Sequence, residues 1–310
     1  MSGTGRVLRL ATRGSAQATA QATAAADALM AAHPGLVVEL VFVETLGDQR
    51  TDVPLHTIGG QGVFVKEVQR AVLDGHADFA AHSAKDLPSA VADGLQLAAF
   101  CERRDARDAL VGLPLDELPH GATVATGSVR RRAQLAAVRP DLQFVELRGN
   151  IHTRLSKLPD GGSLVMAVAA MQILQLTDRI AQALPVDAFV PSPGQGCVAL
   201  ECRADDVEVA GLLAAIDHPL THAAVSLERA FLAELGTGCS LPVAAHAVLD
   251  ADGAFTLTGF LAEPSANLHV TKSVSVRRGD PSADSSGDDG LAQAAALARE
   301  LADALRDGAG

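Results

Sequence analysis

The sequence of 310 residues contains no tryptophan and no tyrosine, and aromatic residues make up only 3% of it. Its core must therefore be built mainly from aliphatic side chains, which a hydrophobic content of 48% can supply. Four cysteines without a C-x-x-C pair are too few for a disulfide framework, so the thiols are expected to be reduced. No apolar run approaches the length of a membrane span.

Several ligand signatures are missing as well. The sequence has neither G-x-x-x-x-G-K-[ST] nor G-x-G-x-x-G, which argues against a nucleotide ligand. Its ten histidines show no H-E-x-x-H or comparable spacing, so no metal is expected. The net charge of −12 argues against binding to nucleic acid or to anionic membranes. The N-terminus, M-S-G-T-G-R-V-L-R-L, has no apolar signal core, which predicts a cytoplasmic location.

Short apolar runs alternate with helical patterns from residue 6 to about residue 200. Strands are predicted in V-L-R-L-A, V-V-E-L-V-F-V, A-D-F-A-A-H, L-Q-L-A-A-F, A-T-V-A-T, L-Q-F-V-E-L and S-L-V-M-A-V. Helices are predicted between them, the first capped by Ser15 and ending before Pro34. The alternation predicts an α/β fold of two similar lobes with mostly parallel or mixed sheets.

From about residue 219 the pattern changes. One amphipathic helix, H-A-A-V-S-L-E-R-A-F-L-A-E-L, is followed by alternating segments with a D-A-D-G turn at 250–253. A polar loop is predicted at 279–290, and a final helix is predicted to run to about residue 307. This part of the chain is predicted to be a small α+β C-terminal domain.

Polar and basic side chains gather where the predicted strands end, which is where open α/β sheets bind ligands. Four of five strand ends carry Ser with Arg or Lys, or a pair of arginines: Arg13 and Ser15; Ser83, Lys85 and Asp86; Ser128, Arg130 and Arg131; Arg148 and Arg154. Segment 126–157 holds seven Lys or Arg against two Asp or Glu. Because arginine pairs bidentately with carboxylate or phosphate, an anion with several acidic groups is the expected ligand. For any single arginine, a solvated helix face remains the simpler explanation.

The cysteines and the Lys–Asp pair stay ambiguous on spacing alone. Cys239 sits among glycines in L-G-T-G-C-S-L-P, where another group can approach closely, although most loop cysteines are inert. Cys101, Cys197 and Cys202 have the surroundings of core residues. The stretch A-H-S-A-K-D-L-P, taken by itself, is typical of an ordinary turn.

Seven stretches together carry a family resemblance: L-R-L-A-T-R-G-S, G-V-F-V-K-E, A-H-S-A-K-D-L-P, A-T-G-S-V-R-R-R-A-Q-L, L-R-G-N-I-H-T-R-L-S-K-L, P-G-Q-G-C-V-A-L-E-C-R and E-R-A-F-L-A-E-L-G-T-G-C-S-L-P-V. Through them, residues 7–247 resemble the porphobilinogen deaminase family, also called hydroxymethylbilane synthase, of heme- and chlorophyll-type tetrapyrrole biosynthesis. The resemblance implies two periplasmic-binding-protein-like lobes, one formed by residues 1–101 and 198–218 and the other by 102–197. It implies a third, cofactor-bearing domain at 219–310.

The implied activity is that of a transferase, which condenses four porphobilinogen molecules head to tail into linear hydroxymethylbilane and releases ammonia. The implied cofactor is dipyrromethane, held by a thioether to Cys239. The partner is then the small-molecule substrate, and no nucleic acid, membrane or obligatory protein partner is expected, so the chain is predicted to be a monomer.

The resemblance also assigns roles to the residues at the strand ends. Asp86 matches the catalytic carboxylate and Lys85 its basic neighbour. Cofactor-binding positions match Arg130, Arg131, Ser128, Lys85 and Asp86. Substrate-binding positions match Arg13, Ser15, Ser83, Arg148 and Arg154.

Two basic family positions are altered here. The usual G-L-[KR]-R-[LM] stretch reads A-M-Q-I-L, which places Ile173 at an arginine position, and Gln61 replaces the lysine of G-K-G-x-F. A catalytically impaired relative therefore stays open as an alternative, as does a cytosolic two-lobed binding module for a polycarboxylate.

Overall fold

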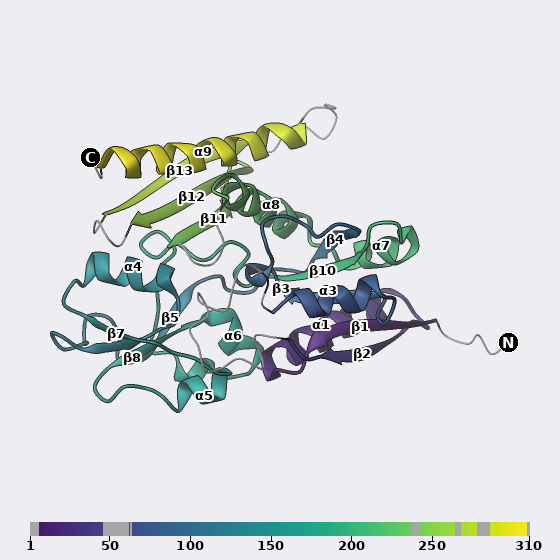
Figure 1. The fold of residues 1–310 in the computed structure, drawn as a ribbon, viewed down its shortest axis with the longest axis horizontal. Helices are drawn as coiled ribbons and strands as arrows, with labels where there is room; N and C mark the ends of the chain where they lie inside the picture. Colours follow the sequence, from purple (N-terminus) through teal and green to yellow (C-terminus); the bar gives the residue numbers. More distant parts are fainter. Residues whose placement is uncertain are drawn as a thin grey trace.

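The computed structural model describes residues 6–45, 62, 64–236, 242–263, 268–277 and 286–308. Three sheets organise this part of the chain, and Figure 1 shows each sheet with its own helices. Among the described residues, none of the helices is long and apolar enough to cross a membrane.

The first lobe is built on a five-stranded sheet with the order β2-β1-β3-β10-β4. Its strands are β1 (Val7–Arg13), β2 (Val37–Val43), β3 (Phe79–Ser83), β4 (Leu95–Phe100) and β10 (Val198–Arg203). Strand β1 runs parallel to β2 and β3, whereas β10 runs antiparallel to β3 and β4. The helices of this lobe are α1 (Ala16–Ala32), α3 (Lys66–Leu73) and α7 (Val207–Leu213), with the short 3-10 helices η2 (Ala84–Asp86) and η4 (Ala214–Ile216).

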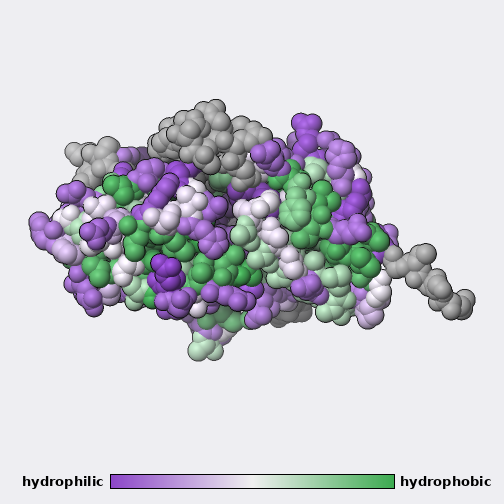
Figure 2. Space-filling view, turned by 90° about the horizontal axis from the view of Figure 1, so that it is seen from below, coloured by the Kyte–Doolittle hydropathy of each residue, from purple (hydrophilic) through white to green (hydrophobic). Residues whose placement is uncertain are grey.

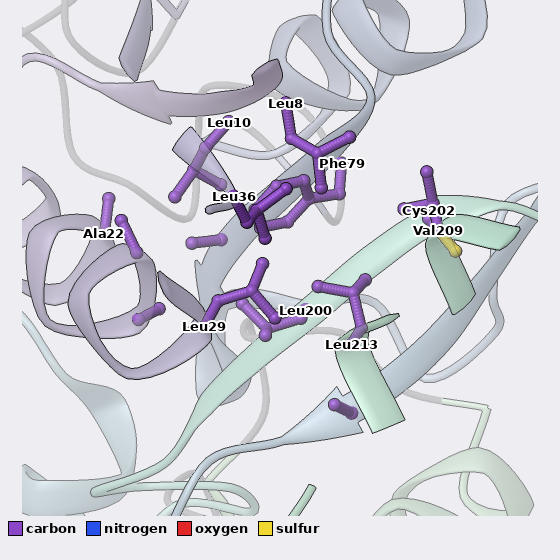
Figure 3. Packing of buried hydrophobic residues seen from close by; sticks show 14 residues of the cluster. Leu8, Leu10, Ala22, Leu29, Leu36, Phe79, Leu200, Cys202, Val209 and Leu213 are labelled. Carbon is purple, nitrogen blue, oxygen red and sulfur yellow. The ribbon is translucent and has the colours of Figure 1, made fainter. Parts of the chain in front are cut away.

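Helix α1 forms where the sequence predicts it, because its start and its buried face are both local signals. The Ser15 hydroxyl accepts a hydrogen bond from the amide of Ala18 and so caps the first turn. Ala22, Ala25, Ala26 and Leu29 are buried at the spacing of one helix face. Figure 3 shows Leu29 of this face near Leu200 of β10, within the core cluster that also contains Leu8, Leu10 and Phe79.

The second lobe repeats the same layout, with the strand order β7-β6-β8-β5-β9. Its strands are β5 (Asp108–Gly112), β6 (Thr123–Ala125), β7 (Gln143–Val145), β8 (Ser163–Ala167) and β9 (Gln182–Ala183). Its helices are α4 (Val129–Val138), α5 (Ile151–Leu155), α6 (Val168–Ile173) and the 3-10 helix η3 (Thr177–Arg179). In each lobe the fourth strand of the order, β10 or β5, is antiparallel to both neighbours, so the sheets are mixed.

Two crossing segments join the lobes. The first crossing segment, residues 101–107, leads from β4 to β5, and the second crossing segment, residues 184–197, leads from β9 back to β10. They touch each other, since the amide of Arg104 donates to the carbonyl of Gly196 at 2.9 Å. We propose domain limits near residues 101, 197 and 218, as the resemblance implies.

The C-terminal part is a three-stranded antiparallel sheet covered by two helices. Strands β11 (Val243–Leu249), β12 (Ala254–Glu263) and β13 (Leu268–Arg277) pair in sequence order, and α8 (Pro219–Glu234) and α9 (Ser286–Gly308) pack against them (Figure 1). Gly259 of β12 lies directly under the Phe231 ring, because a Cβ there would come within 2.6 Å of the ring. This α+β arrangement confirms the predicted third part of the fold.

Two predicted boundaries differ from the structure. The pattern V-F-V-K-E-V-Q-R-A-V-L-D predicts a helix from residue 63 to Gly75, but helix α3 begins at Lys66. Residue 63 itself lies outside the described residues. Helix α9 begins at Ser286, so the polar loop predicted at 279–290 is wrong for its last residues, while 278–285 lie outside the described part of the chain. An acidic residue such as Asp289 suits the first turn of a helix, where it faces the positive end of the helix dipole.

Candidate active site

A cleft of about 750 Å³ lies where the three parts of the chain meet. Its size is within the range of small-molecule sites. The first lobe contributes the ends of β1 and η2, the second lobe contributes the starts of α4 and α5, and the C-terminal part contributes α8 and β11. Of the predicted site residues, the cleft lining contains Arg13, Ser15, Lys85, Asp86, Ser128, Arg130, Arg131, Arg148 and Arg154.

The cleft lining is strongly basic although the whole chain is acidic. Its described residues include seven Lys or Arg side chains but two carboxylates, Glu44 and Asp86. The seven cations are Arg13, Lys85, Arg130, Arg131, Arg148, Arg154 and Arg229. Figure 2 shows hydrophilic and hydrophobic residues interspersed over the face seen from below.

Lys85 and Asp86 stand on η2, the single turn that follows the buried strand β3. The second crossing segment lies directly against this turn. Gly194 has φ +71°, and a Cβ at this position would lie 2.9 Å from the Ala84 Cβ and 3.1 Å from the Lys85 nitrogen. Only glycine therefore allows this close approach without strain.

The Asp86 carboxylate is the less exposed of the two acids that line the cleft. It is partly buried, and none of the described residues donates a hydrogen bond to it or pairs with it within ion-pair distance. A carboxylate in this state can accept hydrogen bonds from pyrrole N–H groups or stabilise a nearby positive charge.

Lys85 points its ammonium group toward the second crossing segment. Its Nζ donates to Oε1 of Gln195 at 3.2 Å. Burial lowers the pKa of Lys85 to about 8, with a further lowering from Arg131 that Asp86 opposes. Lys85 is therefore mostly charged at neutral pH and can bind a carboxylate.

Arg130 and Arg131 share one buried acid, Asp108. Oδ2 of Asp108 lies 2.8 Å from Arg130 Nη1, and its Oδ1 lies 2.7 Å from Arg131 Nη2. Burial alone would raise the pKa of Asp108, but the two guanidinium groups hold it well below its usual range. Because one negative charge faces two positive charges, the group keeps a net positive charge toward the cleft.

Gln195 connects this group with η2, the turn that carries Lys85 and Asp86. Its side-chain nitrogen donates to Oδ1 of Asp108 at 2.9 Å and to the carbonyl of Ala106 at 2.7 Å, while its oxygen accepts from Lys85. A hydrogen-bonded chain thus runs from the first lobe to Arg131 in the second. Sequence reasoning missed Gln195 and Asp108, and the only signal was the position of Gln195 in P-G-Q-G.

Two further basic residues line the cleft from opposite lobes, Arg154 from the second lobe and Arg13 from the first. Nε of Arg154 donates to the carbonyl of Gly149 at 2.8 Å, and burial lowers the pKa of Arg154 to about 10. Arg154 therefore remains charged at neutral pH. The guanidinium of Arg13 lies 4.1 Å from the centre of the Phe64 ring, a cation–π contact.

The three predicted serines have different surroundings. The hydroxyls of Ser15 and Ser128 cap α1 and α4 and line the cleft. Ser83 instead donates to Oε1 of Gln21 at 2.9 Å and lines a neighbouring cavity of about 20 Å³ that also touches Asp86. Ser83 is thus not among the residues lining the main cleft.

Three of the four cysteines have the buried surroundings that the sequence predicts for core residues. Burial raises the pKa of Cys101 and of Cys202 to about 11, and it raises the pKa of Cys197 as well, so these thiols suit a packing role. Cys239 lies outside the described residues, as does Gln61. However, Leu232 and Val243, which flank the Cys239 segment in sequence, both line the cleft. Among the described residues, no cluster of His, Cys, Asp or Glu could hold a metal ion.

Family models match nearly the whole chain. The model described as "Porphobilinogen deaminase, dipyromethane cofactor binding domain" matches residues 8–211, and the model of the porphobilinogen deaminase C-terminal domain matches residues 222–306. The chain belongs to the porphobilinogen deaminase family. A porphobilinogen deaminase from Nitratidesulfovibrio vulgaris (strain DSM 19637 / Miyazaki F) is 45% identical over 261 residues, which cover 83% of this chain and 82% of that relative.

Solved structures of solute-binding proteins show more distant similarities to this family member. The methionine-binding protein MetQ is 16% identical, with a TM-score of 0.44 and coverage of 70% of this chain and 92% of its own. A TRAP periplasmic solute-binding protein from Desulfovibrio salexigens is 10% identical, with a TM-score of 0.43 and coverage of 70% and 74%.

The cleft fits the dipyrromethane cofactor of the porphobilinogen deaminase family. A dipyrromethane carries acetate and propionate groups on each pyrrole ring, and the lining supplies cations in excess of its own acids. The lining also holds an open carboxylate, Asp86, that can accept hydrogen bonds from pyrrole nitrogens.

Proposed function

We propose that this chain condenses four porphobilinogen molecules head to tail into linear hydroxymethylbilane, with release of ammonia. The observation that carries this proposal is the partly buried carboxylate of Asp86, which accepts no hydrogen bond from the described residues, in a cleft whose other charged side chains are mostly basic. The cations suit the acetate and propionate groups of each pyrrole unit. The carboxylate suits the positive charge that develops when ammonia leaves.

We propose Asp86 as the general acid and base and as the electrostatic partner of the substrate cation. Loss of the amine from porphobilinogen leaves an electron-poor azafulvene, and a fixed carboxylate near the pyrrole nitrogen stabilises that charge. The same carboxylate can carry a proton to the leaving amine and accept the proton that the new pyrrole linkage releases. Because no described residue forms a hydrogen bond or an ion pair with Asp86, its carboxylate oxygens are available for these steps.

The basic residues of the cleft are proposed to bind the carboxylates of the cofactor and of the substrate. Lys85, Arg130, Arg131 and Ser128 surround the position proposed for the dipyrromethane, and the thioether is proposed at Cys239. When bound, this cofactor supplies the pyrrole carbon to which the first substrate is joined. Arg13, Ser15, Arg148 and Arg154 are proposed to hold substrate, whereas Ser83 acts from the small cavity behind Asp86.

An impaired relative is the second candidate, since Ile173 and Gln61 stand at two basic family positions. Helix α6 contributes Ala170 to the cleft lining, and Ile173 lies at its end. The cytoplasmic location and the monomeric state also stay predictions.

The intact mass of the denatured protein tests the proposal together with turnover of porphobilinogen. A dipyrromethane adduct is expected on the wild type and is expected to be absent in Cys239→Ser, whereas Cys101→Ser, Cys197→Ser and Cys202→Ser should keep it. An adduct without turnover would favour the impaired relative. A bare wild-type mass would favour the binding module and remove the proposed function.

A further inference from the structure

His82 is a buried histidine close to Asp86 in the sequence, and the proposed reaction gives it no role. It is the fourth residue of β3, and it is only 6% exposed. Its Nε2 lies 3.1 Å from Oε2 of Glu201, whose other carboxylate oxygen accepts a hydrogen bond from Nε2 of Gln69 at 3.0 Å. All three side chains are buried, so they form a hydrogen-bonded cluster inside the first lobe.

The Glu201 carboxylate determines which ring nitrogen of His82 carries a hydrogen. A carboxylate accepts hydrogen bonds, so Nε2 of His82 is the donor in this contact. In the neutral imidazole, Nδ1 is then an acceptor. None of the described residues makes a hydrogen bond to Nδ1. A buried polar atom is expected to have a partner, which can be a bound water molecule.

The small cavity of about 20 Å³ offers a place for such a water molecule. One water needs a cavity of about 10–15 Å³ and two to four polar partners. His82 and Asp86 both line this cavity, together with Ser83 and Gln21. The side-chain oxygen of Gln21 accepts from Ser83, and its nitrogen has no partner in the described part of the chain and can donate. The cavity is therefore large enough and polar enough for one water.

Asp86 stands between the small cavity and the main cleft, because it lines both. Its carboxylate accepts no hydrogen bond from the described residues, although a proton-transfer group has to be held in a fixed orientation. A water in the small cavity would provide that hydrogen bond. It would donate one hydrogen to Nδ1 of His82 and the other to the Asp86 carboxylate, and it would accept from the Gln21 amide.

We propose that the small cavity binds one water molecule that connects Nδ1 of His82 to the Asp86 carboxylate, and that His82 is a positioning residue of the reaction. The inference rests on the proposed function, because it takes Asp86 to be the catalytic carboxylate. Glu201 orients the imidazole, the imidazole orients the water, and the water orients one carboxylate oxygen while the other stays available to the cleft. In a purely structural role, His82 would only bind Glu201.

Two substitutions of His82 separate the contributions of its ring nitrogens. The amide nitrogen of glutamine can replace Nε2, and the amide oxygen of asparagine can replace Nδ1. Cofactor-loaded His82→Gln should keep the bond to Glu201 and lose the bond to the water. Its kcat should fall about ten- to a hundredfold with little change in KM or Tm, as expected for a misplaced catalytic group. His82→Asn should have a lower Tm but keep most of kcat, because its oxygen still accepts from the water.

Gln69→Leu is the matched control. Gln69 is as buried as His82 and bonds to the same carboxylate, but it does not line the small cavity. This variant should have a lower Tm with unchanged kcat and KM. A crystal structure of the wild type provides a readout that needs no turnover. It should show an ordered water between His82 and Asp86, and the structure of His82→Gln should show this water lost or displaced.

A wild-type kcat in His82→Gln would overturn the proposal. So would an equal loss of kcat in Gln69→Leu or in His82→Asn, because either result would indicate only a structural tie to Glu201. A wild-type crystal structure without water in the cavity would overturn it as well. A wild type without adduct or turnover would instead remove the proposed function, whereas the crystal structure would still show whether a water joins the two side chains, so the two failures are distinguishable.

Discussion

At the scale of single residues, the cleft lining contains two kinds of charged side chain. Some form ion pairs within the protein, and others are available to a ligand. Arg130 and Arg131 share Asp108, so they hold their positions in the absence of any ligand. Asp86 and Lys85 carry opposite charges side by side, yet Lys85 bonds to Gln195. The acid is thereby left open to the cleft.

The open state of Asp86 gives the first prediction. Asp86→Asn should lower kcat about 10²- to 10⁴-fold, as expected for one positioned proton-transfer group, with a much smaller change in KM. Asp86→Glu should keep more activity because it retains the charge and mainly misplaces it. Steady-state kinetics on cofactor-loaded protein measure both. A near-normal kcat in Asp86→Asn would reduce the Lys–Asp pair to ordinary turn residues.

The lowered pKa of Lys85 gives a prediction for pH dependence. Lys85 is charged at pH values below its pKa of about 8. Its binding of a substrate carboxylate should therefore weaken as the pH rises through that value. The value of kcat/KM, which reports on the free enzyme, should therefore fall above about pH 8. Lys85→Met should have a lower kcat/KM at pH 7 and should lack this alkaline fall. A profile of the same shape in both proteins would assign the fall to another group.

At the scale of elements, the conformation of η2 depends on glycine in the second crossing segment, which packs against it. Gly194 and Gly196 both have positive φ, and a Cβ on Gly196 would lie 2.7 Å from the carbonyl of Arg104. The P-G-Q-G motif thus lets the second crossing segment touch η2 on one side and the first crossing segment on the other. Gln195 between them reaches Lys85 and Asp108.

Gly194→Ala should therefore damage the site without touching a ligand. The new methyl group meets Ala84 and the Lys85 backbone in a conformation that alanine disfavours, which should cost about 1–3 kcal/mol of unfolding free energy. It should also lower kcat/KM by displacing η2. Gly211→Ala, in α7 with nothing within 4 Å of its added Cβ, should be neutral or slightly stabilising. Urea unfolding and kinetics of both variants make the comparison, and unchanged activity in Gly194→Ala would contradict the positioning argument.

The elements that sequence reasoning predicted well are those with local signals. Helices α1 and α4 have a serine cap and a periodic buried face, and strands β1 and β2 are short runs rich in valine and leucine. Nine predicted site residues share one cleft because strand ends on one edge of each sheet meet there. Asp108 and Gln195 were missed because their partners lie far away in sequence, 23 residues from Asp108 to Arg131 and 110 from Lys85 to Gln195.

At the scale of the whole molecule, one carboxylate joins both crossing segments to the C-terminal part. Glu228 of α8 accepts hydrogen bonds from Arg103 at 2.6 Å, from the Gly194 amide at 2.7 Å and from the Ala247 amide at 2.8 Å. His246 lies 3.2 Å from it as well. Both crossing segments are thus fastened to α8 and β11 at a single buried acid.

Glu228→Gln should destabilise the fold by about 3–5 kcal/mol, because it leaves Arg103 buried without its counter-charge. Burial alone would raise the pKa of Glu228, but Arg103 and His246 lower it to about 2. The stability that this acid contributes is therefore full above its unfolded pKa and is lost as the pH falls from roughly 4.5 to 2. Urea midpoints across that range should converge between wild type and variant at low pH. A constant difference would show that the charge of Glu228 is not the cause.

The late position of β10 in the sequence has a consequence for the order in which the protein folds during synthesis. Strand β10 completes the first sheet between β3 and β4, but it is synthesised only after the entire second lobe. At typical translation rates of about 5–20 residues per second, β3 and β4 wait roughly 5–20 s on the ribosome before their shared neighbour appears. The second lobe, whose strands are contiguous in sequence from β5 to β9, has its whole sheet available during that interval. Synthesis therefore favours an order in which the inserted lobe folds first and the lobe that starts the chain closes around its returning strand.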